Sequence, residues 1–274
     1  MKRFLIINPF GIGDILFTTP VIRAIKESLP DSFIAYWCNA RVKEILEDNP
    51  RVDKLFGLSR GDIKKIYRDS FFSGMYASVG LWQSIRKANF DTAIDFSLDY
   101  RYALTASLAG IKKRIGFDYK NRGRFLTDAI TIAGYKDKHM VEHNLDLLAF
   151  IGLTASFKNL EIFVLQKIEE ISIRFLRKQG VTHDDALIGL VPGGGASWGG
   201  DAGLKRWPVE NFAKLAQELL QKKGVKIVIL GDESERPLAD IIIGMLKDKA
   251  IDLVGKTNLR ELAGIISHLK VLDQ

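Results

Sequence analysis

The chain has 274 residues, of which 47% are hydrophobic and 27% charged, as is typical of a soluble globular protein with one or two domains. No apolar run approaches the ~18 residues that a membrane-spanning helix requires. The single cysteine, Cys38, excludes an internal disulfide and favours a reducing, cytoplasmic location. The formal net charge is +7, and residues 1–155 contain most of it, with 23 lysines and arginines against 17 aspartates and glutamates. This excess indicates an anionic partner, either a phosphorylated substrate or an anionic membrane face. Nucleic acid is not expected, because no block of basic and aromatic residues occurs.

In the first half of the chain, apolar runs alternate with amphipathic segments. The runs predict strands over residues 3–8, 33–38, 52–56 and 92–96. Helices are expected over residues 14–29, with a kink or restart at Pro20, and over 42–47, 81–88, 103–109 and 141–151. Residues 60–78 contain clustered aromatic residues and fit either a mobile flap or a packed helix. A basic segment follows over residues 114–124.

The pattern restarts near residues 154–166. Strands are expected over 187–191, 225–230 and 251–254, with another beginning at 269. Helices are expected over 168–177, 209–220, 238–246 and 259–267. Strands that alternate with helices predict an α/β fold of two Rossmann-like, doubly wound domains that face a cleft. Ligands of such domains bind beyond the carboxyl ends of the strands.

The stretch over residues 191–208 is the most informative part of the sequence. Six glycines lie there between an expected buried strand and an amphipathic helix. Glycine lets the backbone approach a ligand closely, and a helix N-terminus attracts phosphate. Lys205 and Arg206 add positive charge, and Pro208 suits the first helical position. The pattern predicts a phosphate-binding loop, and a plain flexible connection is the alternative.

Two acidic residues follow predicted strands. Asp14 comes after Gly13 at the first strand–helix turn, where a carboxylate either caps the helix or accepts a proton at the mouth of the cleft. Glu233 follows the strand at 225–230, where it either binds a ribose or caps the next helix. No Asp-x-Asp pair occurs, so a diphosphate–metal clamp of that kind is absent. Lys205 and the loop amides would then neutralise the leaving phosphates.

Two other motifs indicate other enzyme classes. The glycines at 11 and 13 lack the third glycine of a dinucleotide fingerprint, whose position is Leu16, so we reject a nicotinamide enzyme. His139 to His143 match the H-x-x-E-H motif of inverted zinc proteases. No flanking signature supports a protease, so a plain helix surface or a substrate-facing histidine is the favoured interpretation.

Five separated segments together resemble glycosyltransferase family 9, the lipopolysaccharide heptosyltransferases. The segments are GIGDILFTTP at 11–20, KRIGF at 113–117, HNLDLL at 143–148, PGG to KRWP at 192–208, and VGKTNLREL at 254–262. The resemblance runs from the first strand to the last residues. It implies a GT-B fold, with an acceptor-binding domain at 1–155 and a sugar-nucleotide domain at 156–274.

The resemblance also implies a reaction: inverting transfer of heptose from ADP-heptose to the lipopolysaccharide inner core, without a metal or other cofactor. Asp14 matches the general base, Lys205 the diphosphate contact and Glu233 the nucleoside contact. The expected donor-binding residues are Gly193, Gly194, Gly195, Ala196, Ser197, Lys205, Arg206 and Glu233. The expected acceptor-binding residues are Gly13, Arg101, Lys113 and Arg114. The implied partners are a sugar nucleotide, a lipopolysaccharide core precursor and the cytoplasmic face of the inner membrane, which the protein would contact peripherally.

Members of this family continue past the position of Leu272 into an Asp-Ser-Gly-Pro-x-His motif and closing helices. The sequence ends before that motif, so we expect an incomplete second domain and weak or no transfer. The alternative function is a non-catalytic remnant that binds an anionic lipopolysaccharide-type partner.

Overall fold

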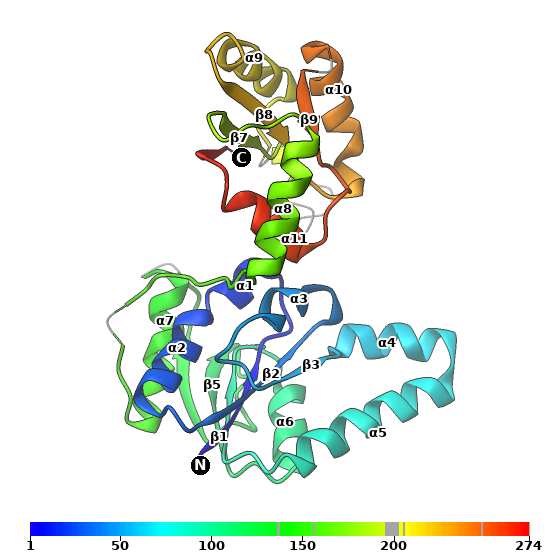
Figure 1. The fold of residues 1–274 in the computed structure, drawn as a ribbon. Helices are drawn as coiled ribbons and strands as arrows, with labels where there is room; N and C mark the ends of the chain where they lie inside the picture. Colours follow the sequence, from blue (N-terminus) through cyan, green and yellow to red (C-terminus); the bar gives the residue numbers. More distant parts are fainter. Residues whose placement is uncertain (136–137, 156, 195–202, 205, 248, 274) are drawn as a thin grey trace. The chain divides into compact units, whose positions relative to one another are not determined.

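The computed structural model describes the chain except residues 136–137, 156, 195–202, 205, 248 and 274 (Figure 1). The chain forms two compact units, Met1–Phe163 and Val164–Gln274. Each unit contains a parallel sheet with helices packed on it, so the predicted α/β class is confirmed. No helix among the described residues is long and apolar enough to cross a bilayer.

The boundary between the units lies at 163, whereas the sequence pattern predicts 155. The segment before the boundary belongs to the first unit because Glu161 is bound there. Its main-chain N–H donates to the Thr19 hydroxyl at 3.0 Å. Its carboxylate pairs with Arg23 at 3.3 Å and with Arg51 at 2.9 Å. The boundary expected from the strand–helix pattern therefore precedes the boundary between the two compact units.

The sheet of the first unit has six parallel strands in the order β3-β2-β1-β4-β5-β6. The strands are β1 (Arg3–Ile7), β2 (Phe33–Cys38), β3 (Lys54–Gly57), β4 (Thr92–Asp95), β5 (Lys113–Tyr119) and β6 (Asp128–Ile132). The order reverses between β1 and β4, which makes the crevice beyond their carboxyl ends the place where a doubly wound sheet binds ligands. Strands β5 and β6 were not predicted. The sequence identifies the region of β5 only as a basic segment, and only one of the five residues of β6 is buried.

Helices surround this sheet. They are α1 (Ile12–Leu16), α2 (Thr19–Ser28), η1 (Ala40–Val42), α3 (Glu44–Glu47), α4 (Arg60–Asp69), α5 (Phe71–Lys87), α6 (Tyr100–Leu108), α7 (Met140–Asp146) and η2 (Leu147–Ile151). Of the kink and the restart expected at Pro20, the restart is confirmed, because α1 ends at Leu16 and α2 begins at Thr19, one residue before Pro20. Residues 60–78, left open by the sequence, form α4 and the first half of α5.

The second unit has a four-stranded parallel sheet in the order β10-β7-β8-β9. Its strands are β7 (Ala186–Leu190), β8 (Val225–Ile229), β9 (Ala250–Asp252) and β10 (Val271–Asp273). Its helices are α8 (Gln166–Lys178), α9 (Val209–Leu219), η4 (Glu233–Glu235), α10 (Arg236–Leu246) and α11 (Leu259–Ile266). Pro208 is the residue before α9 and not its first helical residue, which corrects the prediction by one position.

Alternation along β8 explains why helices cover both faces of this sheet. Ile227 and Ile229 pack with Phe212 of α9 and Ile242 of α10. The intervening Val228 packs on the opposite face, in a cluster that α8 and α11 complete. Because successive side chains of a strand point to opposite faces, a strand that is apolar throughout must be covered on both.

Candidate active site

Asp14 lies at the carboxyl end of β1, beside the point where the strand order reverses. It is the third residue of α1, and its Oδ2 accepts a hydrogen bond from the main-chain N–H of Gly11 at 3.1 Å. The carboxylate therefore has a structural role, because it accepts a hydrogen bond from the residue that precedes the first turn of the helix. That bond occupies one oxygen and fixes the direction of the side chain.

Two asparagines fix the loop that leads to Asp14. Asn8 is buried, and its amide donates to the main-chain carbonyl of Asp14 at 2.9 Å. Its side-chain oxygen accepts from the N–H of Phe10 at 3.2 Å. From the neighbouring strand, Asn39 donates to the carbonyls of Pro9 and Phe10, at 3.0 and 2.7 Å. The loop is thus tied to the sheet through its backbone, which preorganises the Asp14 carboxylate.

A cavity of about 230 Å³ opens beside this carboxylate. Its described lining contains one carboxylate, Asp14, among aromatic, aliphatic and amide side chains. The other lining residues are Asn8, Phe10, Phe96, Leu98, Phe117, Tyr135, Met140 and Asn144. Burial raises the pKa of the Tyr135 phenol to about 12, and the charge of Asp14 acts in the same direction. Tyr135 is therefore a neutral hydrogen-bonding group at neutral pH, and Asp14 supplies the basic oxygen.

A second cavity, of about 610 Å³, adjoins the first, because Phe10 and Leu98 line both. Three guanidinium groups line it, those of Arg60, Arg101 and Arg122. Arg60 and Arg101 both pair with the Asp99 carboxylate, at 2.7 and 2.8 Å. One carboxylate cannot neutralise three cations, so this cavity has a positive excess that suits a phosphate group.

Asp95 is a buried carboxyl at the end of β4, in register with Ile7 of β1. Burial raises its pKa to about 7, although hydrogen bonds from Ser97 oppose the shift. The Ser97 N–H donates to Oδ1 at 2.8 Å. No feature of the sequence pattern separated this aspartate from others that end strands.

The raised pKa of Asp95 predicts a pH-dependent stability. An unfolded chain ionises this carboxyl near pH 4, whereas the folded chain keeps its proton until about pH 7. The free energy of unfolding should therefore fall as the pH rises through this window, by up to about 4 kcal/mol. Asp95→Asn removes this titrating group. In urea unfolding between pH 5 and pH 8, the free energy of unfolding of the variant should therefore rise relative to that of the wild type as the pH rises. A difference that does not change with pH would contradict this assignment.

In the second unit, the glycine loop follows β7 at its carboxyl end, where the strand order reverses between β7 and β10. Gly194 has a φ of 99°, in the left-handed region that favours glycine. Its carbonyl accepts a hydrogen bond from the Arg206 guanidinium at 3.0 Å. Arg206 therefore folds back onto the loop and places its positive charge beside the loop backbone.

Glu235 binds the backbone of the glycine loop, and the sequence analysis did not identify it. It is buried, and its carboxylate accepts hydrogen bonds from the N–H of Gly194 and, at 3.0 Å, from the N–H of Asp232. A Cβ atom at Gly193 would overlap this carboxylate. The loop glycine is therefore required for packing as well as for access to a ligand.

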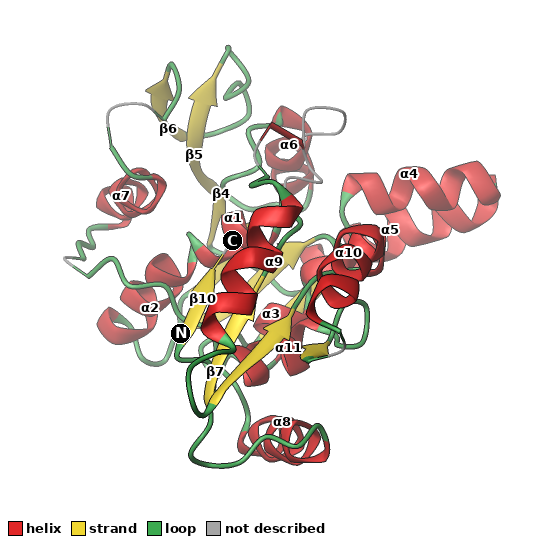
Figure 2. Ribbon diagram, turned by 90° about the horizontal axis from the view of Figure 1, so that it is seen from above, coloured by secondary structure: helices red, strands yellow, loops and turns green. Residues whose placement is uncertain are grey.

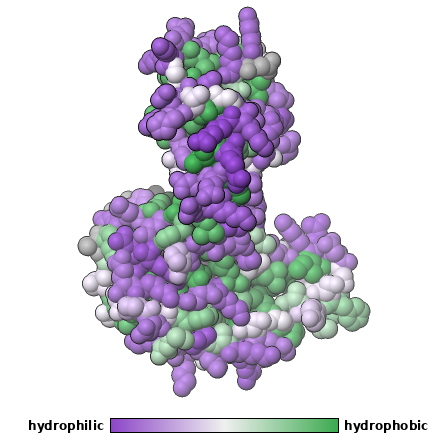
Figure 3. Space-filling view, viewed as in Figure 1, coloured by the Kyte–Doolittle hydropathy of each residue, from purple (hydrophilic) through white to green (hydrophobic). Residues whose placement is uncertain are grey.

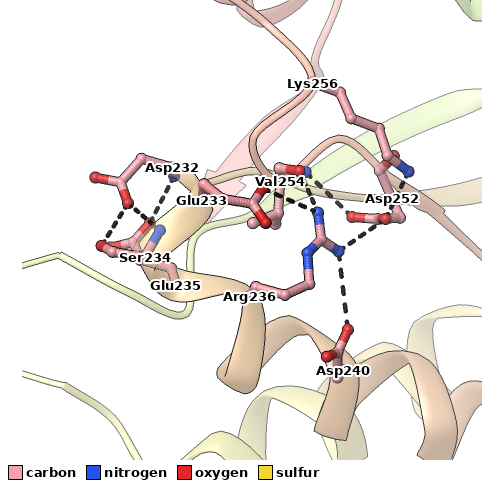
Figure 4. A network of polar contacts seen from close by, with 9 residues as sticks. All are labelled: Asp232, Glu233, Ser234, Glu235, Arg236, Asp240, Asp252, Val254 and Lys256. Atoms are coloured by element: carbon pink, nitrogen blue, oxygen red, sulfur yellow. Dashed lines mark hydrogen bonds and ion pairs between the residues drawn. The ribbon is translucent and has the colours of Figure 1, made fainter.

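Glu233 differs from Glu235 in its surroundings (Figure 4). Its side chain is 76% exposed and reaches Arg236 only at 4.0 Å. Arg236 bonds instead to Asp252 at 2.9 Å and to the Val254 carbonyl. Asp252 also accepts from Lys256 at 2.6 Å. This network positions the segment around Gly255 and leaves the Glu233 carboxylate accessible to a ligand.

A family model described as glycosyltransferase family 9 (heptosyltransferase) matches residues 79–272. The chain belongs to glycosyltransferase family 9. It is 25% identical to lipopolysaccharide heptosyltransferase 3 of Escherichia coli strain K12, over 93% of this chain and 72% of that protein. The structure of a family 9 glycosyltransferase from Veillonella parvula matches with a TM-score of 0.84 and 23% identity, over 99% of this chain and 75% of that one. E. coli ADP-heptose lipopolysaccharide heptosyltransferase II matches with a TM-score of 0.77 and 21% identity, over 100% and 78%.

These matches confirm the predicted GT-B type of fold and show that the chain is a glycosyltransferase. They do not bear out the expected truncation and do not confirm the expected weak or absent transfer, so transfer by this chain is the hypothesis developed below. Of the residues expected in the family 9 donor site, Gly193, Gly194, Arg206 and Glu233 are described, and all four lie at the carboxyl edge of the second sheet. The others, Gly195, Ala196, Ser197 and Lys205, lie outside the described residues.

The acceptor prediction needs one correction. Gly13 adjoins Asp14, and Arg101 lines the second cavity. Lys113 and Arg114, however, begin β5, in register with the first residues of β4. They therefore lie at the amino-terminal ends of the strands, away from the carboxyl ends where the cavities open. Lys113 donates to the carbonyl of Phe150, and Arg114 to main-chain carbonyls that include Phe125 at 2.7 Å.

These two cations therefore stabilise the fold of the first unit. Arg122, beyond the other end of the same strand, is the member of the basic segment that reaches the cavity. Once β5 is known to run parallel to β4, Arg122 is the cation of this segment that lies beyond the carboxyl end of the strand.

The H-x-x-E-H residues also have structural roles. His139 precedes α7, and its Nδ1 accepts from the N–H of Val141 at 3.3 Å. The Glu142 carboxylate accepts from the N–H of His139 at 2.9 Å. His143 is buried beside the rings of Phe117 and Tyr135. No group of three or more His, Cys, Asp or Glu within the described part of the chain is placed to hold a metal ion.

Proposed function

We propose that this glycosyltransferase moves heptose from ADP-heptose to a phosphorylated lipopolysaccharide core acceptor, with Asp14 as the general base. The observation that carries the proposal is the position of Asp14. It is the carboxylate that lines the cavity at the reversal point of the first sheet, and the loop around it is tied down on both sides. Relatives named lipopolysaccharide heptosyltransferases support the choice of sugar and acceptor.

In the proposed step, an acceptor hydroxyl attacks the anomeric carbon of the heptose. Asp14 takes the hydroxyl proton as the new carbon–oxygen bond forms, and the bond to the ADP oxygen breaks with its electron pair leaving on ADP. Attack from the face opposite ADP inverts the anomeric configuration. A base that is held by its own helix cap needs little reorganisation at that moment.

On the donor side, the leaving diphosphate requires positive charge. Arg206 provides it in the described part of the second unit, and the family resemblance adds Lys205 and the amides of the glycine loop. The exposed Glu233 carboxylate suits the hydroxyls of a ribose. The sequence contains no Asp-x-Asp pair, so we propose that transfer needs no divalent metal. Full transfer in excess EDTA, with an inverted anomeric centre in the NMR spectrum of the product, tests this proposal. Restoration of lost activity by added metal would refute the metal-free step, and retained configuration would refute direct displacement.

The acceptor phosphate is assigned to the cavity with three arginines. Arg122→Gln should raise the KM for a phosphorylated acceptor about 10-fold, because a charge-assisted hydrogen bond is worth about 1.5–3 kcal/mol. The KM for ADP-heptose and kcat should change little. A dephosphorylated acceptor is the matched control, since the substitution should not affect it. Equal effects on both acceptors would show that Arg122 has no role in binding phosphate.

A further inference from the structure

Helices α4 and α5 form a hairpin that projects from the first unit (Figures 1 and 2). A single residue, Ser70, joins them, and its side chain caps the start of α5. The helices pack closely because Gly74 lies against the ring of Tyr67, where a Cβ atom would overlap the ring. The Tyr67 and Phe71 rings are 5.8 Å apart across the turn. The hairpin is therefore a packed element of defined shape.

The outer half of α5 is apolar but not buried. Residues 71–85 include no charged residue, yet α5 buries only Gly74 and Ile85. The exposed apolar side chains are Phe71 (64%), Phe72 (75%), Met75 (44%), Tyr76 (83%) and Val79 (45%). Figure 3 shows hydrophobic atoms on this projection beside strongly hydrophilic ones. A group of exposed apolar side chains of this size marks a surface that contacts something else.

Positive charges outnumber negative ones on α4 beside these apolar side chains, and the exposed Asp69 is the carboxylate nearest the tip along the chain. Lys64, Lys65 and Arg68 are exposed on α4, and Arg86 and Lys87 are exposed at the end of α5. Within the described part of the chain, Lys64 and Arg68 form no ion pair. Cations beside exposed aromatic residues match the interface of an anionic bilayer, where rings enter the headgroup layer and cations meet lipid phosphates. A second copy of this surface would instead bring its own positive charges close to these.

We propose that the tip of the α4–α5 hairpin docks the protein on an anionic lipid bilayer, with Phe71, Phe72 and Tyr76 inserted at the headgroup level. A cavity of about 690 Å³ lies at the base of the hairpin and shares Arg60 and Arg101 with the arginine-lined cavity. Trp37, Leu81, Trp82 and Leu108 give it apolar walls. The proposal does not depend on the sugar that is transferred.

The test is co-sedimentation of the full chain with vesicles that contain no lipopolysaccharide. One set is made of phosphatidylethanolamine and phosphatidylglycerol, and the other of phosphatidylcholine alone. We expect binding to the anionic set, reduced by salt, and little binding to the neutral set. The triple variant Phe71→Ser, Phe72→Ser and Tyr76→Ser should bind the anionic vesicles at least about 10-fold more weakly. Ile241→Ser with Met245→Ser, at exposed positions of α10, is the matched control and should bind as the wild type does.

The charge requirement is tested separately. Lys64→Gln with Arg68→Gln should weaken anionic binding by about 5-fold for each charge, whereas Lys222→Gln with Lys223→Gln in the second unit should not. Circular dichroism and thermal unfolding establish that each variant is folded. Absence of wild-type binding, or equal binding by the triple variant, would overturn the proposal. Wild-type self-association without lipid that the triple variant abolishes would assign the surface to a second copy and also overturn it.

Discussion

Asp14→Asn is expected to lower kcat for heptose transfer by about 10²- to 10⁴-fold, the usual contribution of a positioned general base. The KM for the donor should change little, because the donor residues described above belong to the second unit. An asparagine oxygen still accepts the hydrogen bond from Gly11 and preserves the helix cap. The loss should therefore reflect the missing basic oxygen and not a displaced loop. Steady-state kinetics of the purified variant measures it.

Asp62→Asn provides a matched control for this experiment. Asp62 is the third residue of α4 and, like Asp14, accepts from the N–H of the residue before the helix, here Ser59 at 2.8 Å. It lines none of the three cavities described above. Its substitution also leaves an oxygen that accepts this bond, so kcat should be kept. Comparable loss of kcat in both variants, or near-normal kcat in Asp14→Asn, would mean that Asp14 acts only as a helix cap.

Gly193→Ala is expected to have the second largest effect. The new methyl group would overlap the buried Glu235 carboxylate that binds the N–H of Gly194. Overpacking of this kind destabilises a protein by about 1–3 kcal/mol. Because the displaced backbone is the proposed phosphate cradle, the Kd for ADP-heptose should rise at least about 10-fold. Isothermal titration calorimetry measures the affinity, and thermal unfolding measures the stability.

Gly203→Ala is the control within the same region, since a Cβ atom at that glycine meets no atom of the described residues within 4 Å. It should bind donor nearly as well as the wild type. Glu235→Ala should weaken donor binding too, because the Gly194 N–H loses its acceptor. The double variant Gly193→Ala with Glu235→Ala should lose less stability than the sum of the two single variants, because the truncated Glu235 side chain no longer overlaps the new methyl group. Strict additivity would show that Gly193 and Glu235 do not act through each other.

The sequence predicted the elements whose side chains follow a clear period, such as β2, β8 and α9. It left residues 60–78 open because α5 is apolar but exposed, so burial could not be inferred from hydrophobicity. It also chose Lys113 and Arg114 over Arg122. Composition identifies a basic segment, whereas only the parallel pairing of β4 with β5 shows which end of that segment reaches the carboxyl edge.

The two glutamates after β8 illustrate a second limit. Glu233 and Glu235 lie two residues apart, and the sequence analysis singled out Glu233 alone. In the structure, 3₁₀ geometry turns Glu235 beneath the glycine loop and leaves Glu233 exposed. Which carboxylate is structural depends on contacts with Gly193 and Gly194, about 40 residues away in the chain. Such long-range contacts are not encoded in a local pattern.

The most direct test of the account is the mass of a purified lipopolysaccharide core acceptor after incubation with ADP-heptose and the wild-type chain. We predict an increase of one heptose residue with wild type and, in the same time, conversion of only a small fraction of the acceptor by Asp14→Asn. An acceptor that binds the chain but keeps its mass would contradict heptose transfer. It would instead support a non-catalytic protein that binds an anionic lipopolysaccharide-type partner.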